Sequence, residues 1–275
     1  MLQDIGNEIY HCEYNKKRQP DAAKDYLLAI HQERILLLDR AEERLPHLTE
    51  VLNLEKKNLR YLFSISGKAF YWYKKELPEF KGAKYQNVQM LRNIAPGWMA
   101  FAGTTAYHLA YWYEHNQFCG VCGHALEHKQ EERALCCPSC GNIKYPDISV
   151  AMVVGVIHEN KMLLTRYAHR LYRRYSLVAG FNEIGETLED TVRREVKEET
   201  GLHIKNIRYY GNQPWGFSRA LMVGFLAELD GSDKITLEKE ELAEAVWVKR
   251  EDIPKDLAKL SLTANIIRAF GENKI

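Results

Sequence analysis

Three glutamates, Glu195, Glu198 and Glu199, are the residues whose type and spacing point most directly to chemistry. A helix would project them from one shared face, because they lie three and four positions apart. Like charges at this spacing destabilise a bare helix by about 0.2–0.5 kcal/mol per pair, and a bound cation relieves the repulsion. Hard divalent cations such as Mg2+ prefer carboxylate oxygens, water and substrate phosphate. By itself this spacing is more typical of a solvated acidic helix face, and the residues around it are needed to favour a metal site that acts on phosphate.

The segment that carries these glutamates has its own helix signals. Thr187 can cap the N-terminus, and Asp190 suits the positive end of the helix dipole. Gly201 stands where a glycine would end the helix. An apolar stripe for packing recurs at every fourth position, at Leu188, Val192 and Val196. We predict a helix between Thr187 and Gly201 that packs on one face and holds the carboxylates on another.

From Gly180 to Leu202 the fixed positions read G-x5-E-x7-R-E-V-x-E-E-x-G-L. This pattern resembles the Nudix box without a departure, the signature of enzymes that hydrolyse a diphosphate linked to a nucleoside. The resemblance covers about residues 147–275 and implies an α/β/α sandwich around a mixed sheet. Strands expected at 149–158, 161–165, 206–210, 220–229 and 245–249, and a final helix at 263–270, agree with that fold.

The catalytic residues expected from this segment are Glu195, Glu198, Glu199 and Arg194. Glu195 and Glu199 would bind Mg2+ or Mn2+, while Glu198 binds metal or takes a proton from the attacking water. Arg194 would pair with Glu186 and pin the loop to the helix. The resemblance implies two further metal ligands, the backbone carbonyl of Ala179 and the distant carboxylate of Glu241, for which Glu238 and Glu240 compete.

Four of the six cysteines form two C-x-x-C-G pairs with 14 residues between them: Cys119, Cys122, Cys137 and Cys140. Four thiolates at about 2.3 Å make a closed tetrahedral Zn2+ site, which is structural because no position is open to substrate. The alternative is a pair of disulfides. Cys136 would break the spacing and is expected to be a spare thiol, and Cys12 to be inert.

The bulk composition is that of an ordinary water-soluble protein, with 46% hydrophobic and 27% charged residues among 275. The net charge of +1 gives no general attraction for nucleic acid or membrane. No apolar run approaches the length of about 18 residues expected of a membrane span, and the first residues lack a signal-peptide pattern. We therefore expect a cytoplasmic protein without a membrane partner. Three domains are predicted: a β-rich N-terminal domain ending in a helix (1–115), a zinc ribbon (116–146) and the Nudix domain (147–275).

The order of these parts resembles the bacterial NADH pyrophosphatase family, whose members also remove NAD caps from RNA. That family carries S-Q-P-W-P-F-P-x-S downstream of the box, where this chain reads Asn212 to Ala220. The resemblance implies NADH or NAD+ as substrate, NAD-capped RNA as a further partner, and a homodimer. It also implies a set of substrate-binding residues: Tyr145, Phe181, Gln213, Pro214, Trp215, Gly216, Phe217, Ser218, Arg219, Ala220, Glu132, Ala264 and Arg92.

Some positions depart from that family. Gly216 and Ser218 replace two prolines and are expected to loosen the segment, and Ala220 replaces a hydroxyl. Asp147 stands where many members have a basic residue. These departures motivate a second hypothesis, in which the substrate is ADP-ribose, a dinucleoside polyphosphate or another nucleotide sugar. A third hypothesis is a protein of the same fold that senses a nucleotide without cleaving it, although that idea normally goes with a damaged box.

Overall fold

The computed structural model describes residues 1–15, 17–39, 43–169, 174–258 and 260–275. These described residues form two compact units. The N-terminal unit holds Leu2–Asp147 together with Gly216–Arg219, and the C-terminal unit holds Met1, Ile148–Trp215 and Ala220–Ile275. Within the described ranges, no helix is long and apolar enough to cross a membrane.

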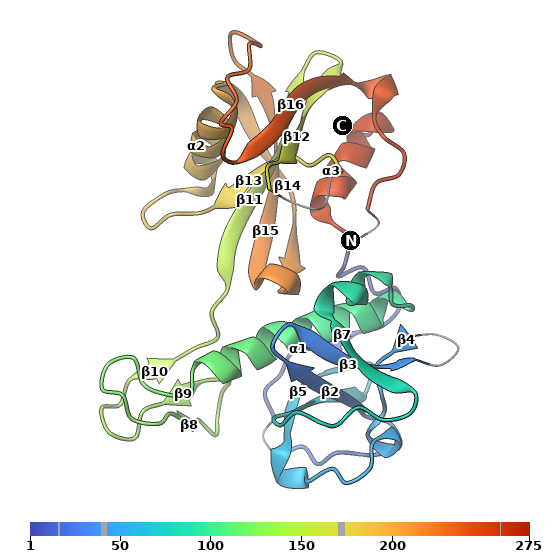
Figure 1. Cartoon of the computed structure of the whole chain (residues 1–275). Coiled ribbons are helices and arrows are strands. Elements are labelled where there is room, and N and C mark those ends of the chain that lie inside the picture. The colour runs from blue at the N-terminus through green and yellow to red at the C-terminus, as the bar shows by residue number, and fades with distance from the viewer. Residues whose placement is uncertain (16, 40–42, 170–173, 259) are drawn as a thin grey trace. The chain divides into compact units, whose positions relative to one another are not determined.

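The C-terminal unit is built on a mixed sheet with the strand order β14-β15-β11-β12-β16, and β13 also pairs with β11. The bounds are β11 Ser149–His158, β12 Lys161–Tyr167, β13 Val178–Phe181, β14 Ile204–Trp215, β15 Ala220–Leu229 and β16 Leu242–Lys249. Strands β11 and β15 run parallel, whereas β13, β12, β16 and β14 pair antiparallel with their neighbours. Helices α2 (Leu188–Thr200) and α3 (Leu262–Gly271) cover opposite faces of this sheet (Figure 1). The predicted α/β/α sandwich is confirmed.

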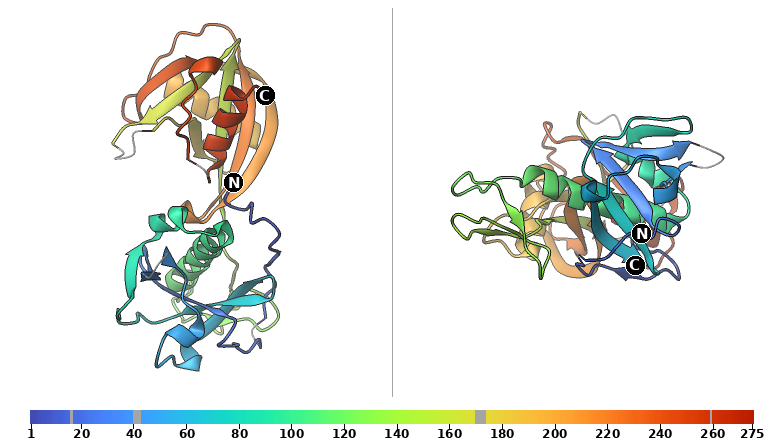
Figure 2. Two further views of the ribbon diagram at one scale, coloured as in Figure 1. Left: turned by 90° about the vertical axis from the view of Figure 1, so that its right-hand side faces the viewer. Right: turned by 90° about the horizontal axis from the view of Figure 1, so that it is seen from below.

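The alternation of side chains along β11 explains the two layers. Met152 and Val154 point into the core under α2, together with Val192 and Val196 of that helix. Val153 points into the opposite core with Ile266 and other residues of α3. Successive strand residues face opposite sides, so a continuous apolar run such as Ala151–Val156 requires a helix on each face. The left view of Figure 2 looks onto α3 with the strands behind it.

The N-terminal unit is β-rich, with the strand order β1-β5-β6-β2-β3-β4 and β7 paired with β3. The bounds are β1 Tyr10–His11, β2 Tyr26–His31, β3 Arg34–Asp39, β4 Glu43–Arg44, β5 Leu59–Ile65, β6 Lys68–Tyr73 and β7 Ala83–Asn87, with short 3-10 turns at Leu48–Glu50, Lys56–Asn58 and Val88–Asn93. Strands β5 and β6 form an antiparallel hairpin, whose turn residues Ser66 and Gly67 both have positive φ angles. Helix α1 (Gly97–His115) is the helix expected near the end of this region.

The zinc ribbon belongs to the same unit and contributes β8 (Glu127–His128), β9 (Leu135–Cys136) and β10 (Ile143–Lys144). Two arginines connect it to the N-terminal sheet. Arg133 of the ribbon donates to the carbonyl of Leu62 on β5, and Arg60 of β5 meets His128 Nδ1 at 2.5 Å. An arginine keeps its proton in proteins, so His128 Nδ1 accepts this hydrogen bond. The ribbon is therefore held on a β-sheet, and the proposed boundaries at residues 115 and 146 stay a prediction.

The connection between β14 and β15 differs from the expected loop over Asn212–Ala220. Strand β14 continues through Trp215, and only a 3-10 turn at Gly216–Ser218 and Arg219 lie between the strands. Gly216 and Phe217 are buried. A Cβ on Gly216 would lie 2.3 Å from the carbonyl oxygen of Thr104 in α1. Glycine at this position therefore allows close packing against a helix, and the expected loosening of the segment stays a prediction.

Candidate metal and nucleotide site

Helix α2 begins and ends where its sequence signals predict. The Thr187 hydroxyl accepts a hydrogen bond from the Asp190 amide at 3.1 Å, which caps the N-terminus. Gly201 adopts φ 71°, and its amide donates to the Lys197 carbonyl, which closes the last turn. Val192 and Val196 are fully buried in the core. The packed stripe orients the helix and thereby holds the carboxylate face in place.

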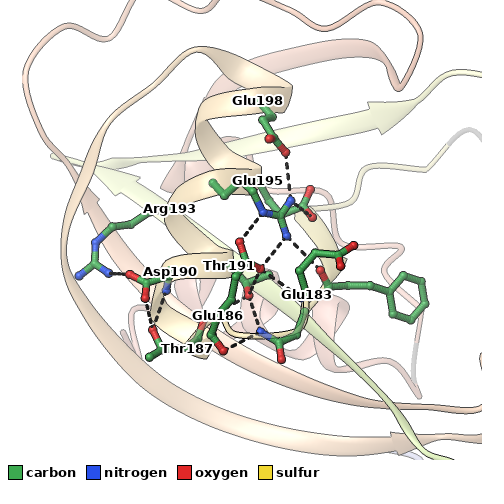
Figure 3. A network of polar contacts seen from close by, with 11 residues as sticks. Glu183, Glu186, Thr187, Asp190, Thr191, Arg193, Glu195 and Glu198 are labelled. Atoms are coloured by element: carbon green, nitrogen blue, oxygen red, sulfur yellow. Dashed lines mark hydrogen bonds and ion pairs between the residues drawn. The ribbon is translucent and has the colours of Figure 1, made fainter.

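Arg194 organises a network of polar contacts at α2, and Figure 3 shows its labelled partners Glu186, Glu195 and Glu198. Its guanidinium donates to both carboxylate oxygens of Glu186, at 2.6 and 3.0 Å, which confirms the expected pair. It also donates to Glu195 at 2.7 Å, to Glu198 at 3.0 Å and to the Phe181 carbonyl at 3.1 Å. The hydrogen bonds from Arg194 lower the pKa of Glu186 to about 2. One arginine therefore fixes the loop, strand β13 and the helix relative to one another.

The predicted carboxylates separate into two environments. Glu195, Glu199 and Glu241 each bring an oxygen atom to within 4.8 Å of the others. Among the described residues, neither Glu198 nor the competitors Glu238 and Glu240 belong to this group. The Glu198 side chain is 60% exposed and pairs with Arg194. The three grouped carboxylates therefore fit a hard cation, while Glu198 lies at the rim.

Burial and charge make the three-carboxylate group costly without a cation. Burial is the main cause of a raised pKa at Glu195, and the nearby charges of Glu198 and Glu241 act in the same direction. Arg194 opposes that shift. Glu199 is almost fully buried. A hard divalent cation would relieve the repulsion between buried carboxylates and satisfy their oxygen atoms.

Gly180 of the box is required by the position of Glu195. A Cβ on Gly180 would lie 2.0 Å from the Glu195 carboxyl carbon and from its Oε1 atom. Real Cβ atoms do not approach so closely, so any larger residue displaces this carboxylate. Because Gly180 has no side chain, β13 leaves the space in which the Glu195 carboxylate lies near those of Glu199 and Glu241.

The four predicted zinc ligands converge. Sulfur atoms of Cys119 and Cys140 lie 3.6 Å apart, and Cys122 lies 3.4 Å from both Cys137 and Cys140. A tetrahedral site with bonds of about 2.3 Å requires sulfur separations of about 3.8 Å, close to these values. Disulfides require about 2.05 Å, so the alternative of two disulfides does not describe this geometry.

Each cysteine pair lies on the same kind of turn. The amides of Gly123 and Gly141 donate to the carbonyls of Cys119 and Cys137, and both glycines have positive φ angles near 75°. Backbone amide hydrogen bonds lower the pKa of the Cys119 thiol to about 6 and also lower that of Cys137. At these two cysteines the backbone therefore stabilises the thiolate form, which is the form that binds zinc.

The two aromatic residues expected to contact the substrate lie in different units. Tyr145 is 52% exposed and Phe181 is 54% exposed, so neither ring is part of a core. Glu132 lies beside Tyr145 and accepts from its hydroxyl at 3.2 Å. The hydrogen bond from Lys129 is the main cause of a lowered pKa at Glu132. Both rings are thus exposed enough to stack on another ring. Hydrogen bonds from Tyr145 and Lys129 orient the Glu132 carboxylate.

Two residues of the turn between β14 and β15, Phe217 and Arg219, take part in cation–π contacts. Arg92 lies 4.5 Å from the centre of the Phe217 ring, and Arg219 lies 4.0 Å from that of Tyr111. Arg219 also donates to the Tyr107 hydroxyl at 3.4 Å. The remaining predicted residues of the segment divide by burial: Pro214 and Ser218 are exposed, Trp215 is half-buried and Ala220 is buried.

Gln213 is buried and supports helix α3. Its side-chain oxygen accepts from the Leu262 amide at 2.6 Å, and its nitrogen donates to the Leu260 carbonyl at 2.6 Å. Ala264, in the first turn of α3, donates its amide to the Ser261 cap at 3.2 Å. Gln213 therefore links β14 to the start of the helix that carries Ala264. Both Gln213 and Ala264 are predicted to bind substrate.

Two supporting residues have no sequence signal in the spacing of the box. The Asn182 side chain donates to Thr191 at 2.7 Å, and the Thr191 hydroxyl donates to Glu186 at 2.9 Å. These contacts extend the Arg194 network into the loop before α2 (Figure 3). The pattern of charged residues did not reveal them, because both side chains are neutral.

Comparison with known proteins agrees with this geometry. Residues 147–270 match the NUDIX domain family, and residues 114–145 match the NADH pyrophosphatase zinc ribbon domain. Residues 147–270 therefore carry a NUDIX domain, and the segment before them carries this zinc ribbon.

The chain is also similar to individual proteins of known name and to a solved structure. It is 38% identical over 168 residues to the NAD-capped RNA hydrolase NudC of Enterobacter sp. (strain 638), covering 61% of this chain and 64% of that protein. It is 41% identical over 146 residues to the protein of the same name from Salmonella typhi, covering 53% and 56%. The matches thus span less than two thirds of these relatives. A solved NUDIX hydrolase from Nitrosomonas europaea is 28% identical with a TM-score of 0.49, covering 57% of this chain and 92% of that one.

Proposed function

We propose that this chain hydrolyses the diphosphate bond of NAD(H) to give NMN(H) and AMP, with Mg2+ or Mn2+ as the catalytic metal and Zn2+ as the structural one. The observation that carries the proposal is the convergence of Glu195, Glu199 and Glu241 beside the Arg194 network. The zinc ribbon and the names of the similar proteins support NAD(H) as the substrate.

The roles of the side chains follow from their environments. Glu195, Glu199 and Glu241 would hold the cation, together with the Ala179 carbonyl. A divalent cation supplies neutralisation of the charge that develops on the phosphate oxygens. Glu198 would accept a proton from the attacking water, a role supported by its exposure and by its contact with Arg194. The water oxygen would bond to one phosphorus while the bond from that phosphorus to the bridging oxygen breaks, and the bridging oxygen leaves with the other phosphate as part of the second nucleotide. Tyr145 and Phe181 would stack on the flat nicotinamide ring.

Product analysis after incubation with NADH and Mn2+ or Mg2+ tests the proposal. NMNH and AMP are the expected products. Glu199→Gln should lower turnover at least about a hundredfold, near the scale of losing one strong electrostatic contribution. Glu189→Gln is the matched control, because Glu189 is an exposed carboxylate in the first turn of the same helix. Full turnover by Glu199→Gln would contradict its role, and no cleavage of any nucleotide would favour a sensor.

NAD-capped RNA is part of the same proposal, because removal of the cap breaks the same bond. A single-stranded RNA end requires stacking and a few phosphate contacts rather than a broad basic surface. ADP-ribose or a dinucleoside polyphosphate is the second candidate. It is favoured by Ala220, which is buried and lacks the hydroxyl that could bond to a phosphate or ribose. Parallel assays with capped RNA, NADH, ADP-ribose and diadenosine polyphosphates separate these substrates.

We also propose that the active form is a cytoplasmic homodimer in which the chains share their sites. The similarity to the NADH pyrophosphatase family supports this assembly. Light scattering coupled to size-exclusion chromatography should give about twice the chain mass of 32.0 kDa. A monomer that retains full turnover would contradict a shared site.

A further inference from the structure

Tyr167, the last residue of β12, contacts the strand that carries the expected carbonyl ligand. Its hydroxyl donates to the carbonyl oxygens of Leu177 at 3.3 Å and Ala179 at 3.5 Å. Carbonyls two residues apart in an extended strand point to the same side. The next carbonyl in this row belongs to Phe181 and accepts from Arg194. The Ala179 carbonyl therefore lies between two side chains that fix the orientation of the strand edge.

The end of β12 also fixes the segment that begins with Glu241. Arg166 lies opposite Glu244 whereas Tyr167 lies opposite Leu242, so β16 has an extra residue at this point. Such a bulge bends the strand and re-aims its side chains, frequently beside an active site. The amide of Ala168 then donates to the Glu241 carbonyl at 2.8 Å. Two consecutive residues, Tyr167 and Ala168, thus contact the backbone carbonyls of two candidate metal-binding residues, Ala179 and Glu241.

We propose that Tyr167 is a positioning residue that aims the Ala179 carbonyl at the same divalent cation as Glu195, Glu199 and Glu241. This role rests on the proposed function. A carbonyl oxygen has two lone pairs, so the tyrosine hydroxyl occupies one and leaves the other for the cation. Neither the spacing of the Nudix box nor the spacing of the acidic residues points to Tyr167, because it lies outside the helix.

The test compares Tyr167→Phe with the unaltered chain in a Mn2+ titration followed by electron paramagnetic resonance of the free ion. Tyr167→Phe retains the ring and removes only the hydroxyl. Loss of a hydrogen-bond partner of a metal ligand typically costs about 10–100-fold in metal affinity or activity, so we expect the Kd for Mn2+ to rise about tenfold. Turnover of NADH should fall at low Mn2+ and recover at high Mn2+, with little change in KM.

Tyr210→Phe is the matched control. It also removes one tyrosine hydroxyl, whose hydrogen bond to Asn265 measures 2.7 Å, and it should leave the Kd for Mn2+ unchanged. An unchanged Kd in Tyr167→Phe, or an equal loss in both variants, would overturn the role of Tyr167. Glu199→Gln separates the two proposals. Loss of Mn2+ binding in Glu199→Gln but not in Tyr167→Phe would overturn only this inference, whereas no Mn2+ binding by the unaltered chain would overturn the proposed function with it.

Discussion

Gly180→Ala is expected to impair the proposed reaction while leaving the fold stable. An added Cβ would lie 2.0 Å from the Glu195 carboxylate, and ordinary contacts begin at 3.4 Å. The carboxylate must therefore move by about 1.4 Å. A misplacement of about 1 Å in a catalytic arrangement can cost about a hundredfold in rate, so kcat should fall by at least that factor. The backbone φ of Gly180 lies outside the left-handed region, so alanine itself introduces no backbone strain.

The effect on stability is expected to be small, because the displaced atoms are the far end of a flexible side chain. We expect a change of less than about 1 kcal/mol in the free energy of unfolding, since alanine is intrinsically favoured over glycine in a strand. Gly211→Ala is the control, because nothing lies within 4 Å of its added Cβ. Chromatography of the NADH products and urea unfolding measure the two quantities. Unchanged kcat and Mn2+ affinity in a folded Gly180→Ala variant would refute the argument that Glu195 must occupy this position.

Three further perturbations test other parts of the structure. The Arg44 guanidinium lowers the pKa of Glu50 to about 2, so their contribution to stability is complete above about pH 4.5 and is lost as the pH falls towards 2. Glu50→Gln should therefore cost about 1–2 kcal/mol in urea unfolding at pH 7, a difference that narrows in acid; a constant difference across this range would argue against the pair. Native mass spectrometry should detect one zinc ion per unaltered chain. Cys137→Ser should lose this ion, whereas Cys12→Ser should retain it. Full zinc content in Cys137→Ser would contradict the four-thiolate site. Gln213→Ala should cost about 1–3 kcal/mol in thermal unfolding, because it leaves buried backbone groups without hydrogen bonds; a smaller loss would mean that water replaces the amide.

Local patterns predicted much of the C-terminal unit. Thr187 and Gly201 bound α2 because capping depends on residues within one helical turn. The apolar runs around Val153 and the stripe at Val192 and Val196 predicted strands and a packed helix, since periodicity alone decides which side chains share a face. The C-x-x-C-G spacings likewise predicted the convergence of the four cysteines, because each pair lies on a single short turn.

Contacts between distant segments required the tertiary structure. The sequence placed Glu198 with Glu195 and Glu199 because helical spacing allows it, yet folding buries two of them beside Glu241 and leaves Glu198 at the rim with Arg194. The number of residues between Glu199 and Glu241 does not determine which acidic side chain arrives at the site. The register shift between β12 and β16 and the hydrogen bond from the Ala168 amide to the Glu241 carbonyl fix the backbone at that position.

The sequence by itself was enough to predict a reaction class and the types of metal ligand, because such predictions depend on residue identities within short segments. Only the tertiary structure explains why a side chain at Gly180 or Gly216 would collide with neighbouring atoms. It also shows which carbonyl oxygens accept a hydrogen bond from Tyr167. These features depend on close approach between atoms far apart in the chain. Pairing registers and core packing set those distances, and residue spacing along one segment carries no information about them.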